Sequence, residues 1–121
     1  MAEKCTPDDA VEIAKHGVEL SVYNTSTSVA SVAQVGVAAG HFEEFYDTVS
    51  TYMYYLSSGT GTFVLDDKHI QVEEGDLVVA PPGTRIHYFG TMELLLTLVP
   101  PFAPENERHV RDVDPSESPY R

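Results

Sequence analysis

Two histidines and two glutamates occur at spacings that could build a metal site. His41 and Glu43 are two residues apart, so they point to the same side if this stretch is extended, and Glu44 follows directly. His87 lies far downstream, and a one-residue bulge near Arg85 would rotate its ring into the same interior. Imidazole and carboxylate groups that converge on one point bind divalent metals. One hypothesis is therefore a site for Fe, Mn, Ni or Zn made by His41, Glu43, Glu44 and His87.

The same residues allow an interpretation without a metal. Strand alternation places Ile86 and Tyr88 on one face and His87 on the opposite face. If Ile86 faces the interior, His87 faces outwards and cannot join an interior site. The Glu43-Glu44 pair is then a solvated turn, and the interior holds no metal.

Tyrosines form the second group of residues that could do chemistry. Tyr52 and Tyr54 alternate along one segment and should project into the interior together. A buried tyrosine hydroxyl needs a hydrogen-bond partner, which can be a protein group or a ligand. A tyrosine beside a histidine or glutamate can also act as a general acid or base, and an arginine can anchor an anionic group. We expect a ligand pocket lined by Tyr52, Tyr54, Phe63, Arg85, Ile86 and Tyr88.

Short β-forming segments separated by turn residues must position these groups. We predict strands at 18–23, 29–38, 51–56, 62–65, 69–72, 77–80, 86–89 and 93–99, with turns at 57–61 and 66–67. Residues 40–47 are predicted as a loop or irregular strand. Thr6, followed by Pro7 and two aspartates, has the pattern of a helix start, and Gly17 could end that helix. The Pro-rich segment after residue 100 is predicted to be an irregular tail.

Two stretches resemble the conserved motifs of the cupin superfamily. The first is Tyr54-Tyr-Leu-Ser-Ser-Gly-Thr-Gly-Thr-Phe-Val-Leu-Asp66, and the second is Gly75-Asp-Leu-Val-Val-Ala-Pro-Pro-Gly-Thr-Arg-Ile-His-Tyr88. The resemblance covers roughly residues 40–99. It implies an all-β fold, an antiparallel double-stranded β-helix (the jelly-roll or cupin barrel), here with a short N-terminal helix and an irregular C-terminal tail.

The resemblance also implies a metal, held by two histidines and a glutamate from the first motif and a histidine from the second. In this sequence the glutamate position falls on Tyr52 and the last histidine position on Ile86. The motif is therefore degenerate, because hydroxyl and aliphatic groups do not bind a divalent metal well. The two remaining positions fall on Tyr46 and Thr48, or on Phe45 and Asp47 if the gap is one residue longer.

Composition limits the partners. The 121 residues suffice for one domain, and 19 acidic against 7 basic residues give a net charge of −12. Such an acidic chain is a poor partner for nucleic acid or an anionic membrane. The sequence has no apolar run of membrane-spanning or signal-peptide type, so we expect a cytoplasmic protein. The sequence has no Gly-rich phosphate loop ending in Gly-Lys-Ser or Gly-Lys-Thr and no Gly-x-Ser-x-Gly elbow of a serine hydrolase, and the single Cys5 excludes a cysteine-based zinc site.

These observations give one domain plan and two main hypotheses. Residues 1–17 should form an N-terminal segment with a short helix, 18–100 the barrel, and 101–121 a tail that packs on the barrel or on a partner in a homodimer. The first hypothesis is a protein that binds a small molecule without a cofactor. The alternative is a metal-dependent enzyme of isomerase, cyclase or oxygenase type, which acts on a small polar substrate through the irregular His/Glu site. A third possibility is a dimer with a filled barrel and a purely structural role.

Overall fold

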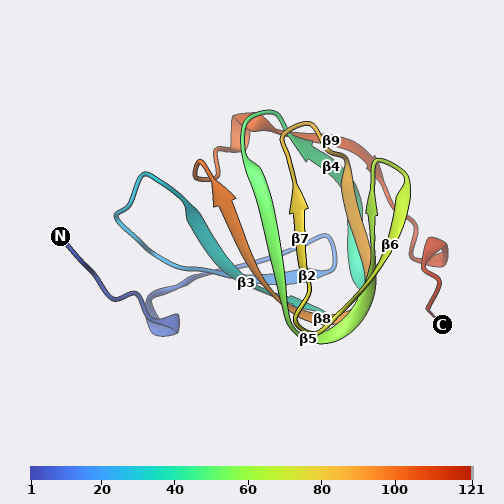
Figure 1. The fold of residues 1–121 in the computed structure, drawn as a ribbon, viewed down its shortest axis with the longest axis horizontal. Helices are drawn as coiled ribbons and strands as arrows, with labels where there is room; N and C mark the ends of the chain where they lie inside the picture. Colours follow the sequence, from blue (N-terminus) through green and yellow to red (C-terminus); the bar gives the residue numbers. More distant parts are fainter. Residues whose placement is uncertain (121) are drawn as a thin grey trace.

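Across residues 1–120, which the computed structural model describes, nine antiparallel strands form one sheet that curls on itself (Figure 1). The sheet follows the order β1-β2-β3-β8-β4-β9, and β5 joins β8 to β6 and β7. The all-β jelly-roll prediction is confirmed. The strands are β1 Val11–Lys15, β2 Val18–Val22, β3 Ser31–Val37, β4 Gly40–Asp47, β5 Thr51–Leu65, β6 Lys68–Glu73, β7 Leu77–Ala80, β8 Ile86–Val99 and β9 Glu107–Asp112.

Strands β5 and β8 are much longer than predicted. They pair from Thr51↔Val99 to Leu65↔Ile86, with one register shift between Leu56 and Ser58. The turn expected at 57–61 is wrong, because the chain continues as a strand and bends there. Gly61 and Gly90 lie opposite each other at this bend, so two backbones without side chains cross closely.

The N-terminal helix is also a wrong prediction. Only a 3-10 turn, Pro7–Asp9, forms after Thr6, and β1 and β2 follow as a hairpin. His16 and Gly17 are the two residues of its turn, and both have positive φ angles, 51° and 94°. Such a two-residue turn matches the twist of paired strands. The alternation of Val11, Ile13 and Lys15 along one face, rather than helical periodicity, decides this segment.

The C-terminal tail is more ordered than predicted. A 3-10 turn, Pro104–Asn106, leads into β9, which pairs with β4, and a second turn, Pro115–Glu117, follows. Val113 is buried in a small cluster with Val64 and Phe89 on the outside of the sheet. Tyr120 then contacts Thr62, with 2.8 Å between the hydroxyl oxygens. The segment after β9 therefore lies over the outer face of the barrel, on the side of β4 and β6 in Figure 1.

The main core fills the inside of the curled sheet. Inward positions of β5 and β8 alternate with outward ones, so the buried side chains of both strands meet there. The core comprises Val18, Val35, Val37, Phe45, Tyr52, Tyr54, Leu56, Phe63, Val72, Val78, Ala80, Ile86, Tyr88, Met92, Leu94, Leu96 and Leu98.

No helix in residues 1–120 is long and apolar enough to cross a bilayer.

Candidate functional site

A cavity of about 270 Å³ opens between the N-terminal hairpin and the inside of the barrel. This volume is close to the lower limit of the roughly 300–1,000 Å³ that is usual for small-molecule binding sites. Apolar side chains of β1, β2, β3 and β8 form most of its wall. Six strands contribute polar groups to it, which are His41, Tyr52, Tyr54, Tyr88, Lys15, Ser31 and Glu107.

A chain of polar contacts lies at the end of the cavity beside β9. The Tyr52 hydroxyl donates to Glu107 Oε2 at 2.6 Å and lies 3.3 Å from Asp47 Oδ2. Lys15 Nζ is 3.6 Å from Glu107 Oε1 and lies over the ring of Phe102, 5.6 Å from its centroid. Both terminal segments therefore contribute to this end, because Lys15 comes from β1 and Glu107 from β9.

His41 is the one imidazole among the described residues that lines this cavity. Its side chain is buried, and this burial lowers its pKa to about 4, so the ring is neutral at pH 7. His41 Nδ1 lies 2.8 Å from the backbone carbonyl oxygen of Glu43. A carbonyl only accepts, so Nδ1 carries the proton and Nε2 keeps a free lone pair. The ring can therefore act as a base.

Tyr54 and Tyr88 supply hydroxyl groups to the same cavity. Their rings pack edge to face with centroids 5.7 Å apart, and the Tyr88 ring lies 5.2 Å from that of His41. Burial raises the pKa of both tyrosines, so they remain protonated and can donate a hydrogen bond. In residues 1–120 the tyrosine hydroxyls that bond to other groups belong to Tyr23, Tyr52 and Tyr120, which leaves those of Tyr54 and Tyr88 free for a ligand.

The six predicted pocket residues fall into three groups. Tyr52, Tyr54 and Tyr88 line the cavity. Phe63 and Ile86 are buried in the core behind the wall, where the Phe63 ring stacks on Tyr88 with centroids 4.6 Å apart. Arg85 lies on the outside and pairs with Asp67, so it does not reach the cavity.

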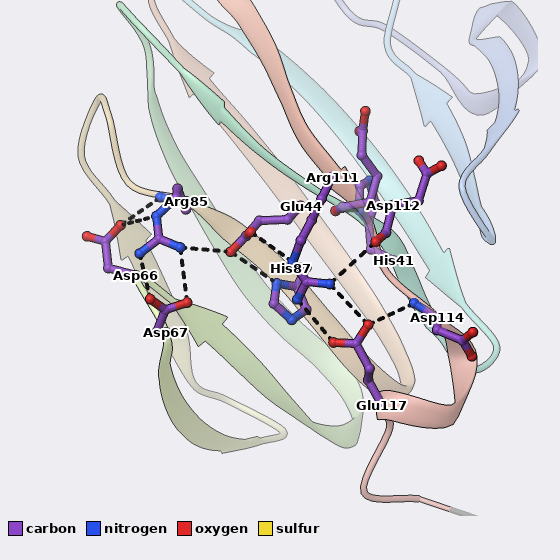
Figure 2. A network of polar contacts seen from close by, with 11 residues as sticks. His41, Glu44, Asp66, Asp67, Arg85, His87, Arg111, Asp112, Asp114 and Glu117 are labelled. Carbon is purple, nitrogen blue, oxygen red and sulfur yellow. Dashed lines mark hydrogen bonds and ion pairs between the residues drawn. The ribbon is translucent and has the colours of Figure 1, made fainter.

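The four residues of the metal hypothesis are not brought together. His41 faces the cavity, whereas His87 packs edge to face on Phe89 on the outer side of the sheet. The predicted alternation is thereby confirmed, because Ile86 and Tyr88 are in the main core. Figure 2 shows Glu44 among arginines next to His87, away from His41. The side chain of Glu43 pairs with two other histidines, His16 and His109.

The groups at the cavity do not fit the divalent metal that the fold family implies. In residues 1–120 no three His, Cys, Asp or Glu side chains are placed to hold a metal ion. The cavity offers one imidazole, protonated tyrosines, and a carboxylate, Glu107, that already pairs with Lys15 and Tyr52. A positive lysine beside the carboxylate further disfavours a cation there.

The sequence prediction of the pocket misses most of the cavity wall, including Lys15, Phe102 and Glu107. Lys15 lies in the segment that the sequence predicts as a helix, and Phe102 and Glu107 lie in the predicted irregular tail. In the sequence prediction, His41 has a role only as a metal ligand. The alternation of residues 11, 13 and 15 was the available signal for Lys15, whereas no local pattern places the strand of Glu107 beside β4.

Comparisons with known proteins identify a matching family model and similar solved structures. A model of the EutQ-like cupin domain matches residues 25–99. The chain is 44% identical to Pac13, described as a unique nucleoside dehydratase, over 99% of this chain and 100% of that one, with a TM-score of 0.95. Streptomyces Pac13 has also been solved with uridine in a histidine-to-glutamine variant and two tyrosine-to-phenylalanine variants, each 43% identical, with TM-scores of 0.95 and at least 99% of both chains covered.

A more distant structure shares only the fold. The polyketide cyclase RemF from Streptomyces resistomycificus is 14% identical, with 92% of this chain and 87% of that one covered and a TM-score of 0.73. No curated protein sequence matches the chain.

Proposed function

Because the chain belongs to the family of EutQ-like cupin domains, we propose that its cavity binds a nucleoside and removes water from it without a metal. The observation that carries the proposal is His41, a neutral imidazole with a free Nε2 lone pair, beside two unpaired tyrosine hydroxyls. The identity of 44% along the whole chain to a nucleoside dehydratase supports this substrate class.

Residue positions strengthen the comparison. The three substituted positions in the uridine-bound variants of Pac13 are a histidine and two tyrosines, and each is numbered one place higher than His41, Tyr54 or Tyr88 of this chain. Both chains are matched over nearly their full lengths, and the same offset of one place relates all three positions to residues of the same type. The side chains that line the cavity here thus correspond to those substituted in the uridine complexes.

The arrangement provides the proton transfers that dehydration needs. A C–H bond breaks and its electron pair forms a C=C bond, while the hydroxyl on the next carbon leaves with its electron pair and takes up a proton. His41 Nε2 accepts the proton from carbon. The protonated ring or a tyrosine hydroxyl then protonates the departing oxygen, and in a mostly apolar cavity these hydrogen bonds are stronger than in water.

The metal-dependent alternative finds no support in this donor set. Its four residues lie on two sides of the sheet, as described above, and the cavity itself provides no second imidazole within residues 1–120. The proposal therefore keeps the metal-free hypothesis and adds a reaction to it.

The proposal is tested by calorimetry with uridine and by mass spectrometry of nucleosides incubated with the protein. We expect uridine to bind at one site, and a nucleoside derivative to lose one water. His41→Gln should abolish turnover, and Tyr54→Phe and Tyr88→Phe should reduce it. Tyr55→Phe is the matched control, because Tyr55 is the exposed neighbour of Tyr54 and faces outwards. Failure of every nucleoside to bind would overturn the proposal.

A further inference from the structure

Strand β4 contains a bulge directly after the catalytic candidate His41. His41 lies opposite Tyr88 and Phe45 lies opposite Ile86, so three residues of β4, numbers 42–44, face a single residue of β8. The pairing of β4 with β9 contains a second register shift, between Glu44 and Phe45. A bulge leaves residues out of the ladder and turns their groups to new directions.

The bulge holds His41 through the main chain. Its Glu43 carbonyl is the group that accepts the hydrogen bond from His41 Nδ1, at 2.8 Å. Flanking segments fix the same bulge: the Phe42 amide donates to the carbonyl of His16 at 2.7 Å, and the Phe42 carbonyl accepts from the Val113 amide at 3.0 Å. The direction of one carbonyl in the bulge therefore decides which nitrogen of His41 carries the proton.

The side chain of Glu44 ties the bulge to the outer face of the sheet. Only 2% of this residue is exposed, and its carboxylate lies between two arginines. Glu44 Oε2 is 3.3 Å from Arg85 Nη1, and Glu44 Oε1 is 3.3 Å from Arg111 Nε (Figure 2). His87 Nδ1 lies 3.7 Å from the same carboxylate, too far for a hydrogen bond, and has no other partner in residues 1–120.

Each arginine is in turn fixed by an exposed carboxylate. Arg85 makes two hydrogen bonds to Asp67, at 3.0 and 2.8 Å, and Arg111 makes two to Glu117, both at 3.0 Å. Planar guanidinium groups held in this two-point way have little freedom. A buried carboxylate is costly without its charged partners, so Glu44 is confined to the place between these two arginines.

We propose that Glu44 is a positioning residue for His41. By anchoring the bulge between Arg85 and Arg111, it keeps the Glu43 carbonyl directed at His41 Nδ1–H and so leaves Nε2 as the free base. The inference rests on the proposed role of His41 as that base. It assigns a function to a network on the outer side of the sheet, which does not itself contact the cavity.

The test is the tautomer of His41, read from the ¹⁵N shifts of its ring in long-range ¹H–¹⁵N NMR spectra of the free protein. The wild type should show the Nδ1–H form. In Glu44→Gln the ratio of the Nε2–H form to the Nδ1–H form should rise about fivefold, which corresponds to the net contribution of one hydrogen bond. Asp67→Asn is the matched control, because it removes an exposed carboxylate from the same Arg85 and leaves the tautomer unchanged.

An unchanged Nδ1–H form in folded Glu44→Gln would overturn the inference. Arg111→Lys is measured in parallel, because it keeps both the charge and Glu44 but removes the Nε contact. It should shift the tautomer in the same direction, and it decides the question if Glu44→Gln does not fold. The spectra need no nucleoside. Failure of uridine to bind would thus count against the proposed function alone, and an unshifted tautomer against the role of Glu44 alone.

Discussion

The imidazole of His41 combines burial with a fixed hydrogen bond to a main-chain carbonyl. Burial is the largest influence on its pKa, which falls to about 4, and the nearby Glu43 only partly opposes it. A base whose conjugate acid has such a low pKa stays unprotonated across the physiological range. The same shift links the ring to folding, because an unfolded histidine has a pKa near 6.5.

Stability should therefore fall as the pH is lowered from about 6.5 towards 4. In this window the unfolded chain binds a proton at His41 and the folded chain does not. The free energy of unfolding therefore falls by about 1.4 kcal/mol for each pH unit by which the pH is lowered. The measurement is urea unfolding of the wild type and His41→Gln at several pH values. The difference between the two proteins should show this slope, and a pH-independent difference would contradict the shifted pKa.

The hydroxyl of Tyr52 should contribute to stability rather than to proton transfer. It donates to Glu107 at 2.6 Å, and burial is the largest of the influences that raise its pKa. Tyr52→Phe leaves a partly buried carboxylate with one donor fewer, which should cost about 1–3 kcal/mol of unfolding free energy. Chemical denaturation measures this loss. Equal stability of Tyr52→Phe and the exposed-site variant Tyr55→Phe would show that the bond contributes nothing.

At the scale of elements, the barrel depends on the bend that β5 and β8 share. Gly90 has a φ angle of 129°, and a Cβ atom there would lie 2.5 Å from the carbonyl oxygen of Thr60. Both strands cross at this point with no space for a methyl group. The bend brings Tyr54 and Tyr88, from the two long strands, into contact inside the barrel.

Gly90→Ala should destabilise the protein far more than Gly83→Ala. Both glycines have positive φ angles, but a Cβ at Gly83 would meet nothing within 4 Å. We expect about 1 kcal/mol for the backbone strain at Gly83 and a further 1–3 kcal/mol or more for the steric overlap at Gly90. Thermal unfolding of the two variants tests the difference, and similar melting temperatures would contradict the packing described.

The elements show where sequence reasoning succeeds. Alternation and turn residues predicted β2, β6 and β7 closely, and the tight turn at Asp66-Asp67 is present, with φ angles of 50° and 68°. The prediction failed at 57–61, where glycines that usually mark a turn serve a bend within a strand. It failed at 11–15 because capping residues before the segment outweighed the alternation within it.

The site was predictable only in part, for a related reason. The inward direction of Tyr52 and Tyr54 follows from the alternation of side chains along one strand. The outward direction of His87 follows from the same alternation in the strand after the Pro-Pro-Gly turn. Lys15 and Glu107 come from opposite ends of the chain. Their meeting depends on the pairing of β9 with the distant strand β4, and on the attachment of the β1–β2 hairpin to the sheet through β3. The bulge that orients His41 likewise arises from pairing with β8 and β9, which no local pattern indicates.

At the scale of the whole molecule, charge should select among nucleoside ligands. The chain has a net charge of −12, and the lysine at the cavity already pairs with Glu107. A surrounding negative potential repels anions. Uridine should therefore bind more tightly than uridine monophosphate.

Calorimetry at low and high salt tests this selection. Added salt should narrow the difference between the two ligands, because it screens exposed charges beyond about 10 Å at 0.1 M ionic strength. Equal or tighter binding of the monophosphate at low salt would show that the cavity holds a cationic group which the described contacts do not provide.

The most direct test of a metal-free nucleoside site is a uridine titration of protein treated exhaustively with a chelator, with its metal content measured in the same sample. We expect one uridine to bind per chain, with the same affinity before and after chelation and no stoichiometric metal. Loss of binding on chelation, with recovery when Fe, Mn, Ni or Zn is added back, would contradict it.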